Sequence, residues 1–214
     1  MIENATLVKF SEYKYLRQLK VEGLIYMNNL PFIRKIEDKM LRGDMFDSVT
    51  EIHRGKTGTL TPNNKPENIF QFGNWVLGID RSPPEKVNIF CMCSVRPSKG
   101  IFPIDDRNFS FGDYALIFTK PQEFIDRISR YLQSQNVSHK ASLIDYFEEN
   151  YTGEVGFFKK RIHFQYQHEW RLVCKNGPGK ARIFHIGSIK DICIIVKNTE
   201  VNQRLSKILN VTLP

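Results

Sequence analysis

Residues 160–174 read Lys-Arg-Ile-His-Phe-Gln-Tyr-Gln-His-Glu-Trp-Arg-Leu-Val-Cys, and this stretch decides the fold that the sequence predicts. Apolar and polar side chains alternate along it, which is the period of a strand whose two faces differ. We therefore expect one long strand in an antiparallel sheet, because such sheets commonly bury one face and leave the other polar. The polar face holds Arg161, His163, Gln165, Gln167, Glu169 and Arg171.

Outward from this strand, apolar runs predict further strands at residues 6–10, 24–27, 69–78, 87–95, 114–118, 181–186 and 191–197. Helices are expected between Ser11 and Gly23, between Pro31 and Gly43, from Thr119, near 140–150 and from Thr199. Asn176-Gly177 predicts a hairpin between strands 160–174 and 181–186. The polar, turn-rich residues 53–66 predict a mobile surface loop.

The order of these elements favours the α+β class in a single domain of residues 1–214, because the helices are inserted among strands rather than alternating with them. Hydrophobic residues make up 41% and charged residues 25%, as in ordinary globular chains. No apolar run approaches the roughly 20 residues of a membrane span, and the N-terminus lacks a secretion signal, so a cytoplasmic protein is expected. The four cysteines lie in apolar runs without zinc-site spacing, so neither disulfide nor metal is expected.

The net charge of +8 is concentrated in one part of the chain. Residues 159–190 hold eight Lys or Arg and a single acid, Glu169, whereas residues 1–50 hold eight basic and seven acidic residues. Such a patch suits a polyanionic ligand, whether a dinucleotide, RNA or DNA. A merely solvated basic face is the equally weighted alternative.

Glu169 is the best candidate for a catalytic residue. Gln167 and Glu169 project from the same face of the expected strand, about 7 Å apart. Nearby positive charge lowers the pKa of a carboxyl group, so Glu169 is expected to stay ionised. Two alternatives remain: the polar face is simply solvated, or Glu169 forms a structural ion pair with Arg171, in which case neither residue is catalytic.

Three features resemble the ADP-ribosyltransferase superfamily. Lys9 lies on the first strand, Tyr26 lies on the next strand in Leu24-Ile25-Tyr26-Met27-Asn28-Asn29, and Gln167-His168-Glu169 resembles the family's Q/E-x-E motif. The opening segment and Glu-Trp-Arg also resemble an uncharacterised bacterial and phage domain family that we place in the same superfamily. Lys9 stands where members usually have Arg or His, and it lacks their guanidinium fork or imidazole.

The resemblance implies a mainly antiparallel split sheet with flanking helices, NAD as cofactor, and an oxocarbenium-like state at the ribose C1′. Glu169 would then bind the ribose 2′-hydroxyl and offset the growing positive charge, while Gln167 would orient the acceptor. Tyr26 would stack on nicotinamide, and Lys9 and Arg171 would meet phosphate or ribose oxygens. Asn28, on the strand of Tyr26, is a further cofactor-binding candidate.

The resemblance also implies a macromolecular acceptor for ADP-ribose, and the basic patch favours RNA or DNA. Related bacterial and phage transferases act as toxins or defence effectors, so a neutralising antitoxin is a candidate partner. The rival class is a non-catalytic nucleic-acid-binding module that uses the same patch, with Glu169 incidental. Neither a membrane nor a metal ion is an expected partner.

Overall fold

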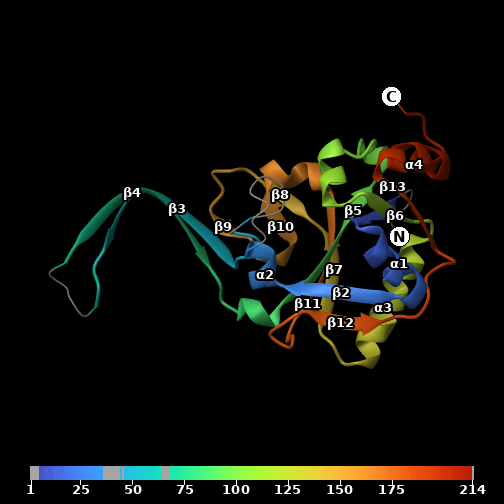
Figure 1. Ribbon diagram of the computed structural model, residues 1–214. Coiled ribbons are helices and arrows are strands. Elements are labelled where there is room, and N and C mark those ends of the chain that lie inside the picture. Colours follow the sequence, from blue (N-terminus) through green and yellow to red (C-terminus); the bar gives the residue numbers. More distant parts are fainter. Residues whose placement is uncertain (1–4, 36–43, 45, 64–67, 214) are drawn as a thin grey trace.

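The computed structural model describes residues 5–35, 44, 46–63 and 68–213, and a large antiparallel sheet forms its centre (Figure 1). The strands of this sheet are β1 (Thr6–Ser11), β2 (Leu24–Asn29), β5 (Asn88–Val95), β6 (Tyr114–Phe118), β7 (His139–Leu143), β11 (Glu169–Cys174), β12 (Arg182–His185) and β13 (Cys193–Lys197). The main path runs β12-β2-β5-β1-β6-β13, and β11 pairs with both β5 and β7. The α+β class and the mainly antiparallel sheet are thereby confirmed.

Four α-helices accompany the sheet: α1 (Tyr13–Glu22), α2 (Leu30–Lys35), α3 (Pro121–Ser134) and α4 (Val201–Leu209). In α3, Phe124, Ile128 and Leu132 recur every fourth residue, so they form one buried stripe against the sheet. Burial of each such side chain stabilises the fold by about 1.5–3 kcal/mol. Helices α1 and α3 share one apolar cluster, whereas α4 packs into a second cluster.

Shorter elements complete the chain. Five strands lie outside the large sheet: β3 (Glu51–Leu60), β4 (Phe70–Ile79), β8 (Asp145–Phe147), β9 (Gly153–Glu154) and β10 (Lys159–Arg161). Short 3-10 helices cover Pro84–Lys86, Pro97–Lys99, Asp106–Phe111, Gly156–Phe158, Ile162–Gln167 and Asn198–Glu200. β8 pairs with β10, the only parallel pair among the described strands, while β9 pairs with the root of β3.

The expected long strand 160–174 is wrong, because a 3-10 helix over Ile162–Gln167 separates β10 from β11. His168 closes that helix with a left-handed backbone (φ 40°) and turns the chain into β11. Alternation still holds within β11, so Glu169 and Arg171 share a face, but Gln167 reaches them from a different element.

Two further expectations fail, and a third is confirmed in the part that is described. The helix near 140–150 is replaced by β7 and β8, since β7 is the edge neighbour of β11 and its pairing outweighs the local helical spacing. No hairpin forms at Asn176-Gly177, because β12 pairs with β2 and β11 with β5. The helix expected between Pro31 and Gly43 is present as α2 (Leu30–Lys35), and residues 36–43 lie outside the described residues.

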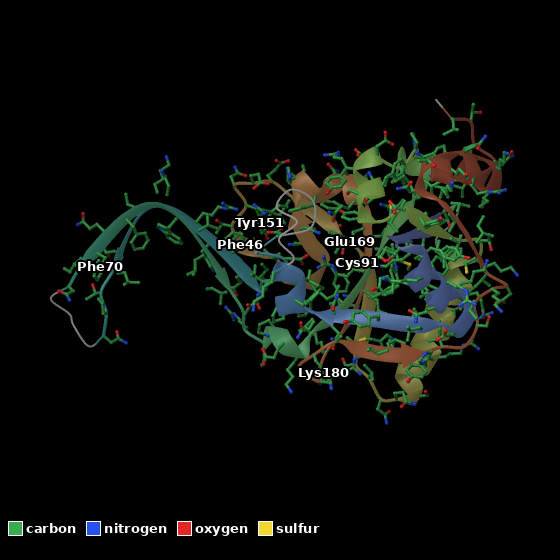
Figure 2. The ribbon with its side chains drawn as sticks, viewed as in Figure 1. Phe46, Phe70, Cys91, Tyr151, Glu169 and Lys180 are labelled. Atoms are coloured by element: carbon green, nitrogen blue, oxygen red, sulfur yellow. The ribbon has the colours of Figure 1, made fainter. Side chains whose placement is uncertain are left out.

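The predicted loop 53–66 is also wrong, because residues 51–60 form β3 and pair along their length with β4. We call this β3–β4 ribbon, in its described residues 51–63 and 68–79, the arm. It projects away from the rest of the molecule (Figure 1). Along most of the arm, the side chains do not contact the rest of the described residues (Figure 2).

Candidate functional site

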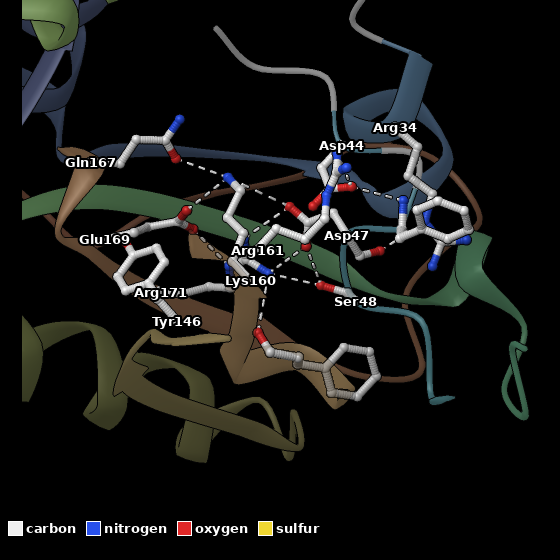
Figure 3. A network of polar contacts seen from close by, with 12 residues as sticks. Arg34, Asp44, Asp47, Ser48, Tyr146, Lys160, Arg161, Gln167, Glu169 and Arg171 are labelled. Atoms are coloured by element: carbon white, nitrogen blue, oxygen red, sulfur yellow. Dashed lines mark hydrogen bonds and ion pairs between the residues drawn. The ribbon is translucent and has the colours of Figure 1, made fainter. Parts of the chain in front are cut away.

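Four buried ionisable side chains meet inside the body near the start of the arm, and we call them the buried charge cluster: Asp47, Lys160, Glu169 and Arg171 (Figure 3). Their exposed fractions lie between 1% and 5%. Arg171 joins the two acids, since its Nη1 and Nη2 donate to Asp47 at 2.7 and 3.0 Å and its Nε donates to Glu169 at 2.6 Å. Lys160 Nζ lies 3.2 Å from Glu169 Oε2 and 3.8 Å from Asp47 Oδ2.

Separate elements supply these groups. Glu169 and Arg171 project from one face of β11, Lys160 comes from β10, and Asp47 lies in the turn that leads into the arm. Ser48 follows Asp47 with a left-handed backbone (φ 58°), and its hydroxyl accepts from Arg171 Nη1 at 2.7 Å. Two acids and two cations therefore balance inside the protein, which a buried charge requires.

The cluster fixes the charge state of its acids. Burial alone would raise the pKa of Glu169, but the Arg171 and Lys160 charges outweigh it and hold that pKa far below its usual value. Burial would likewise raise the pKa of Asp47, but the positive charges of Arg171 and Lys160 outweigh it and lower that pKa. Glu169 is therefore ionised near neutrality, as the sequence predicted.

Polar neighbours complete the surroundings of Glu169. Gln167 Oε1 accepts from Lys160 Nζ at 2.8 Å, so the amide and the carboxylate are joined through one ammonium group (Figure 3). The Glu169 backbone N–H donates to the Tyr146 hydroxyl at 2.9 Å. Cys91 lies opposite Arg171 on β5, and burial raises the pKa of its thiol to about 12, so it is a protonated thiol rather than a nucleophile.

These contacts decide between the two structural alternatives. The solvated polar face is wrong for Gln167, Glu169 and Arg171, which are 7%, 5% and 1% exposed. The ion pair between Glu169 and Arg171 is confirmed at 2.6 Å. Whether either residue also takes part in a reaction stays a prediction.

The predicted cofactor-binding residues fall on both faces of the sheet. Val8 pairs with Cys93, which pairs with Glu169, so Lys9 points to the opposite face from Glu169. Lys9 Nζ instead donates to the Cys91 carbonyl at 2.8 Å and lies 4.7 Å from the centre of the Phe90 ring.

Tyr26 and Asn28 lie on the same face as Glu169. Asn28 pairs with Ile89, which pairs with Val173 on the face of Glu169, and Tyr26 is two residues away on the same strand. Tyr26 is 51% exposed, and its cross-strand partner is Ile183. It is therefore open to a ligand, unlike the buried charge cluster.

Two adjoining hollows lie at the turn between β11 and β12, and we call them together the basic hollow. Their volumes are about 330 and 540 Å³, and Asn176 and Gly177 line both. Cations contribute to both walls, and no acidic residue is among the described residues that line them. The lining cations are Lys86, Lys175, Lys180 and Arg182.

The turn that carries the basic hollow is held from beneath by buried Asn88. Its Nδ2 donates to the carbonyls of Lys180 and Met27 at 2.9 and 3.2 Å. Gly177 packs so closely on Asn88 Oδ1 that a Cβ there would overlap it, which explains the glycine. Asn29 Nδ2 also donates to the Gly179 carbonyl at 3.1 Å, so the turn is fixed before any ligand binds.

Sequence reasoning missed Asp47 as a site residue and treated Lys160 as part of a surface patch. Nothing local marks Asp47, because its partner Arg171 is 124 positions away. The basic patch of residues 159–190 is accordingly divided: Lys160 and Arg171 are buried in ion pairs, whereas Lys175, Lys180 and Arg182 line the basic hollow.

Three general properties bear on function. All four cysteines are free thiols. Within the described ranges, His, Cys, Asp and Glu side chains do not gather in groups that would hold a metal ion. None of the helices in the described residues combines the length and apolar character needed to cross a membrane.

Comparisons with protein-family models, with curated proteins and with solved structures found no match.

Proposed function

We propose that this protein binds single-stranded nucleic acid through the basic hollow. The observation that carries the proposal is the set of four lining cations without an acidic neighbour among the described lining residues. Phosphate groups bind such clusters because the Lys and Arg side chains replace, and so release, the counterions condensed on the nucleic acid. A fixed turn favours binding further, since little conformational freedom is lost when the ligand arrives.

Exposed apolar side chains beside the cations favour a single strand over a duplex. Ile183 lines the hollow, and its cross-strand neighbour Tyr26 presents half of its surface to solvent. Unstacked bases gain about 1–3 kcal/mol each by stacking on an aromatic side chain, whereas a duplex keeps its bases inside. The cations of the basic hollow and the neighbouring Tyr26 thus offer both phosphate and base contacts.

Fluorescence anisotropy with a labelled single-stranded RNA and DNA, and with a duplex of the same length, tests this proposal. Four phosphate contacts predict that log K falls with log salt at a slope of about −3 for a single strand. Lys175→Ala and Lys180→Ala should each weaken binding and make that slope shallower by about 0.7.

Lys207→Ala is the matched control, because Lys207 is an exposed lysine on α4, away from the turn between β11 and β12. Equal losses in the control and the hollow variants would show non-specific attraction by net charge. Binding that does not respond to salt would also contradict the proposal, since phosphate contacts require that response.

We propose transfer of ADP-ribose from NAD to a macromolecule as the second candidate function. It is supported by an ionised Glu169 joined to Gln167 through Lys160, with Tyr26 and Asn28 on the same face of the sheet. In this reaction the bond from ribose C1′ to nicotinamide breaks, nicotinamide leaves with the bonding pair, and an acceptor oxygen or nitrogen bonds to C1′ and loses its proton. Glu169 would have to exchange Lys160 for the ribose 2′-hydroxyl.

Nicotinamide release from NAD, with RNA present and absent, tests this second candidate. Glu169→Gln should abolish release, whereas Asp47→Asn, an equally buried change in the same cluster, should retain it if the folded fraction is equal. Loss in both variants would indicate a structural cluster, and no release from the wild type would reject transfer. A toxin role and a neutralising antitoxin depend on this activity, and growth arrest on expression would be its sign.

A further inference from the structure

The arm exposes more large apolar side chains than a solvated ribbon requires. Beyond its root, where β9 pairs with Glu51 and Ile52, the two strands of the arm pair only with each other among the described strands. Six of its large apolar residues are between 38% and 62% exposed: Leu60, Ile69, Phe70, Phe72, Val76 and Leu77. An isolated two-stranded ribbon is at best marginally stable in water, so this one gains from further pairing.

Local geometry gathers most apolar side chains of β4 on one face, whereas Val76 alternates to the other. Asn74 adopts a left-handed backbone (φ 51°), which brings Phe72 and Trp75 to one side despite their odd spacing. A Cβ on Gly58 would meet both rings, and one on Gly55 would meet Trp75, so glycines on β3 make room for the aromatics of β4. Trp75 Nε1 donates to the Thr57 carbonyl at 2.9 Å and fixes its ring.

The outer edge of the arm is unusual because β4 holds ten residues without a charge or a proline. Natural proteins normally protect an exposed edge strand with lysine, proline or a short length. β3, by contrast, carries Glu51, Arg54 and Lys56. An unprotected edge on one strand only is typical of a strand that pairs with another chain.

We propose that β4 pairs antiparallel with β4 of a second copy of this chain, which makes the two arms a four-stranded sheet. Antiparallel self-pairing about a two-fold axis between Asn74 and Trp75 places Phe70 opposite Ile79 and Phe72 opposite Leu77. Small or polar residues then face one another at Gln71 and Gly78. Because β4 is uncharged, no like charges meet across the axis.

The area that β4 offers is that of a small, weakly associating interface. Phenylalanine side chains have roughly 150–250 Å² of surface, so Phe70 and Phe72 at about half exposure, with the smaller Val76 and Leu77 beside them, offer on the order of 300 Å² per copy. Backbone atoms of a ten-residue edge add to this area, and a standard interface buries about 800 Å² on each partner. Nucleic acid fits the edge of β4 less well, because none of its ten residues carries a positive charge to meet phosphates.

Light scattering after size-exclusion chromatography, over a range of protein concentrations and without nucleic acid, tests the proposal. The wild type should elute at twice the mass of the chain. Leu77→Lys, which places a charge on the apolar face, should weaken dimerisation by roughly tenfold or more. Leu213→Lys, the same change at an exposed leucine near the C-terminus, should leave the dimer intact.

Hydrogen exchange locates the interface and distinguishes the other outcomes. Amides of residues 70–79 should exchange more slowly in the dimer, and Leu77→Lys should remove that protection while its circular dichroism spectrum stays unchanged. A wild-type monomer at all concentrations would overturn the proposal, as would a dimer whose protection lies outside β4. Arm protection that appears only with RNA or DNA would assign the arm to nucleic acid instead.

Discussion

Replacing Lys160 by Met and Glu169 by Gln, singly and together, should show that the buried charge cluster is held by charge balance. Each single change leaves one uncompensated charge among groups that are at most 5% exposed. Removing one partner of a buried ion pair costs about 3–5 kcal/mol of the free energy of unfolding. The double variant restores balance, because Arg171 and Asp47 keep their two hydrogen bonds at 2.7 and 3.0 Å.

The double variant should therefore be more stable than either single variant, at least ~2 kcal/mol above the value that additivity predicts. Urea unfolding at pH 7, monitored by tryptophan fluorescence and circular dichroism, gives the free energy of unfolding of the wild type, the two single variants and the double variant. Equal m-values would show that the same surface is exposed on unfolding in each protein. Additivity within about 0.5 kcal/mol would refute the reasoning, since it would mean that Lys160 and Glu169 do not stabilise each other.

The same proteins should differ in how their stability depends on pH. The pKa values of Glu169 and Asp47 are lowered in the folded state, so between the folded and unfolded values the unfolded chain binds more protons. The stabilisation is complete above the ordinary values of 4.5 and 3.8 and is lost as the pH falls below them. In Glu169→Gln the free energy of unfolding should fall less steeply as the pH is lowered below about 4.5. An unchanged dependence on pH would show that Glu169 is not responsible for the loss of stability in acid.

Three further outcomes follow from the packing. Gly177→Ala should destabilise the fold by about 1–3 kcal/mol, because its Cβ would overlap Asn88, and it should also weaken RNA binding in the anisotropy assay. Gly58→Val should displace the Phe72 ring and lower the melting temperature less than Gly177→Ala does. Hydrogen exchange that becomes faster only in the arm would reveal this local effect. Cys91, with a pKa raised by burial to about 12, should resist iodoacetamide at pH 8 until urea unfolds the chain, as mass spectrometry of the labelled peptide would show.

Local sequence signals predicted most of the large sheet. The strand expected at 114–118 coincides with β6, and the helix predicted to end at Gly23 does so, because Gly23 adopts a left-handed backbone (φ 65°). The helix expected near 140–150 failed for a non-local reason. The apolar residues of 140–150 have helical spacing. The backbone N–H and C=O groups of β7 nevertheless pair with β11, which lies some thirty positions later in the chain.

The candidate site was predictable only in part. Alternation placed Glu169 and Arg171 on one face and offered their ion pair as an alternative, and both features are present. The break at His168 could not be read from the pattern, since Ile162–Gln167 keeps the alternation of a strand while forming a 3-10 helix. The turn 175–180 was read as a hairpin loop, although its function in the fold is to carry the chain from β11 across to β12.

The buried charge cluster and the arm are parts of one construction. Asp47 and Ser48 lie just before β3, so Arg171 binds the root of the arm to the centre of the sheet through three hydrogen bonds to these two residues. Its fourth hydrogen bond goes to the Phe157 carbonyl. Apolar residues would provide comparable stability, but a buried bidentate ion pair accepts only one geometry, and buried ionic groups can thereby select a single arrangement. Arm pairing needs such an arrangement, because two arms of fixed direction lose less freedom when they meet than two that swing. The buried charge cluster, which fixes the direction of the arm, and the uncharged edge of β4 therefore both favour pairing of two arms.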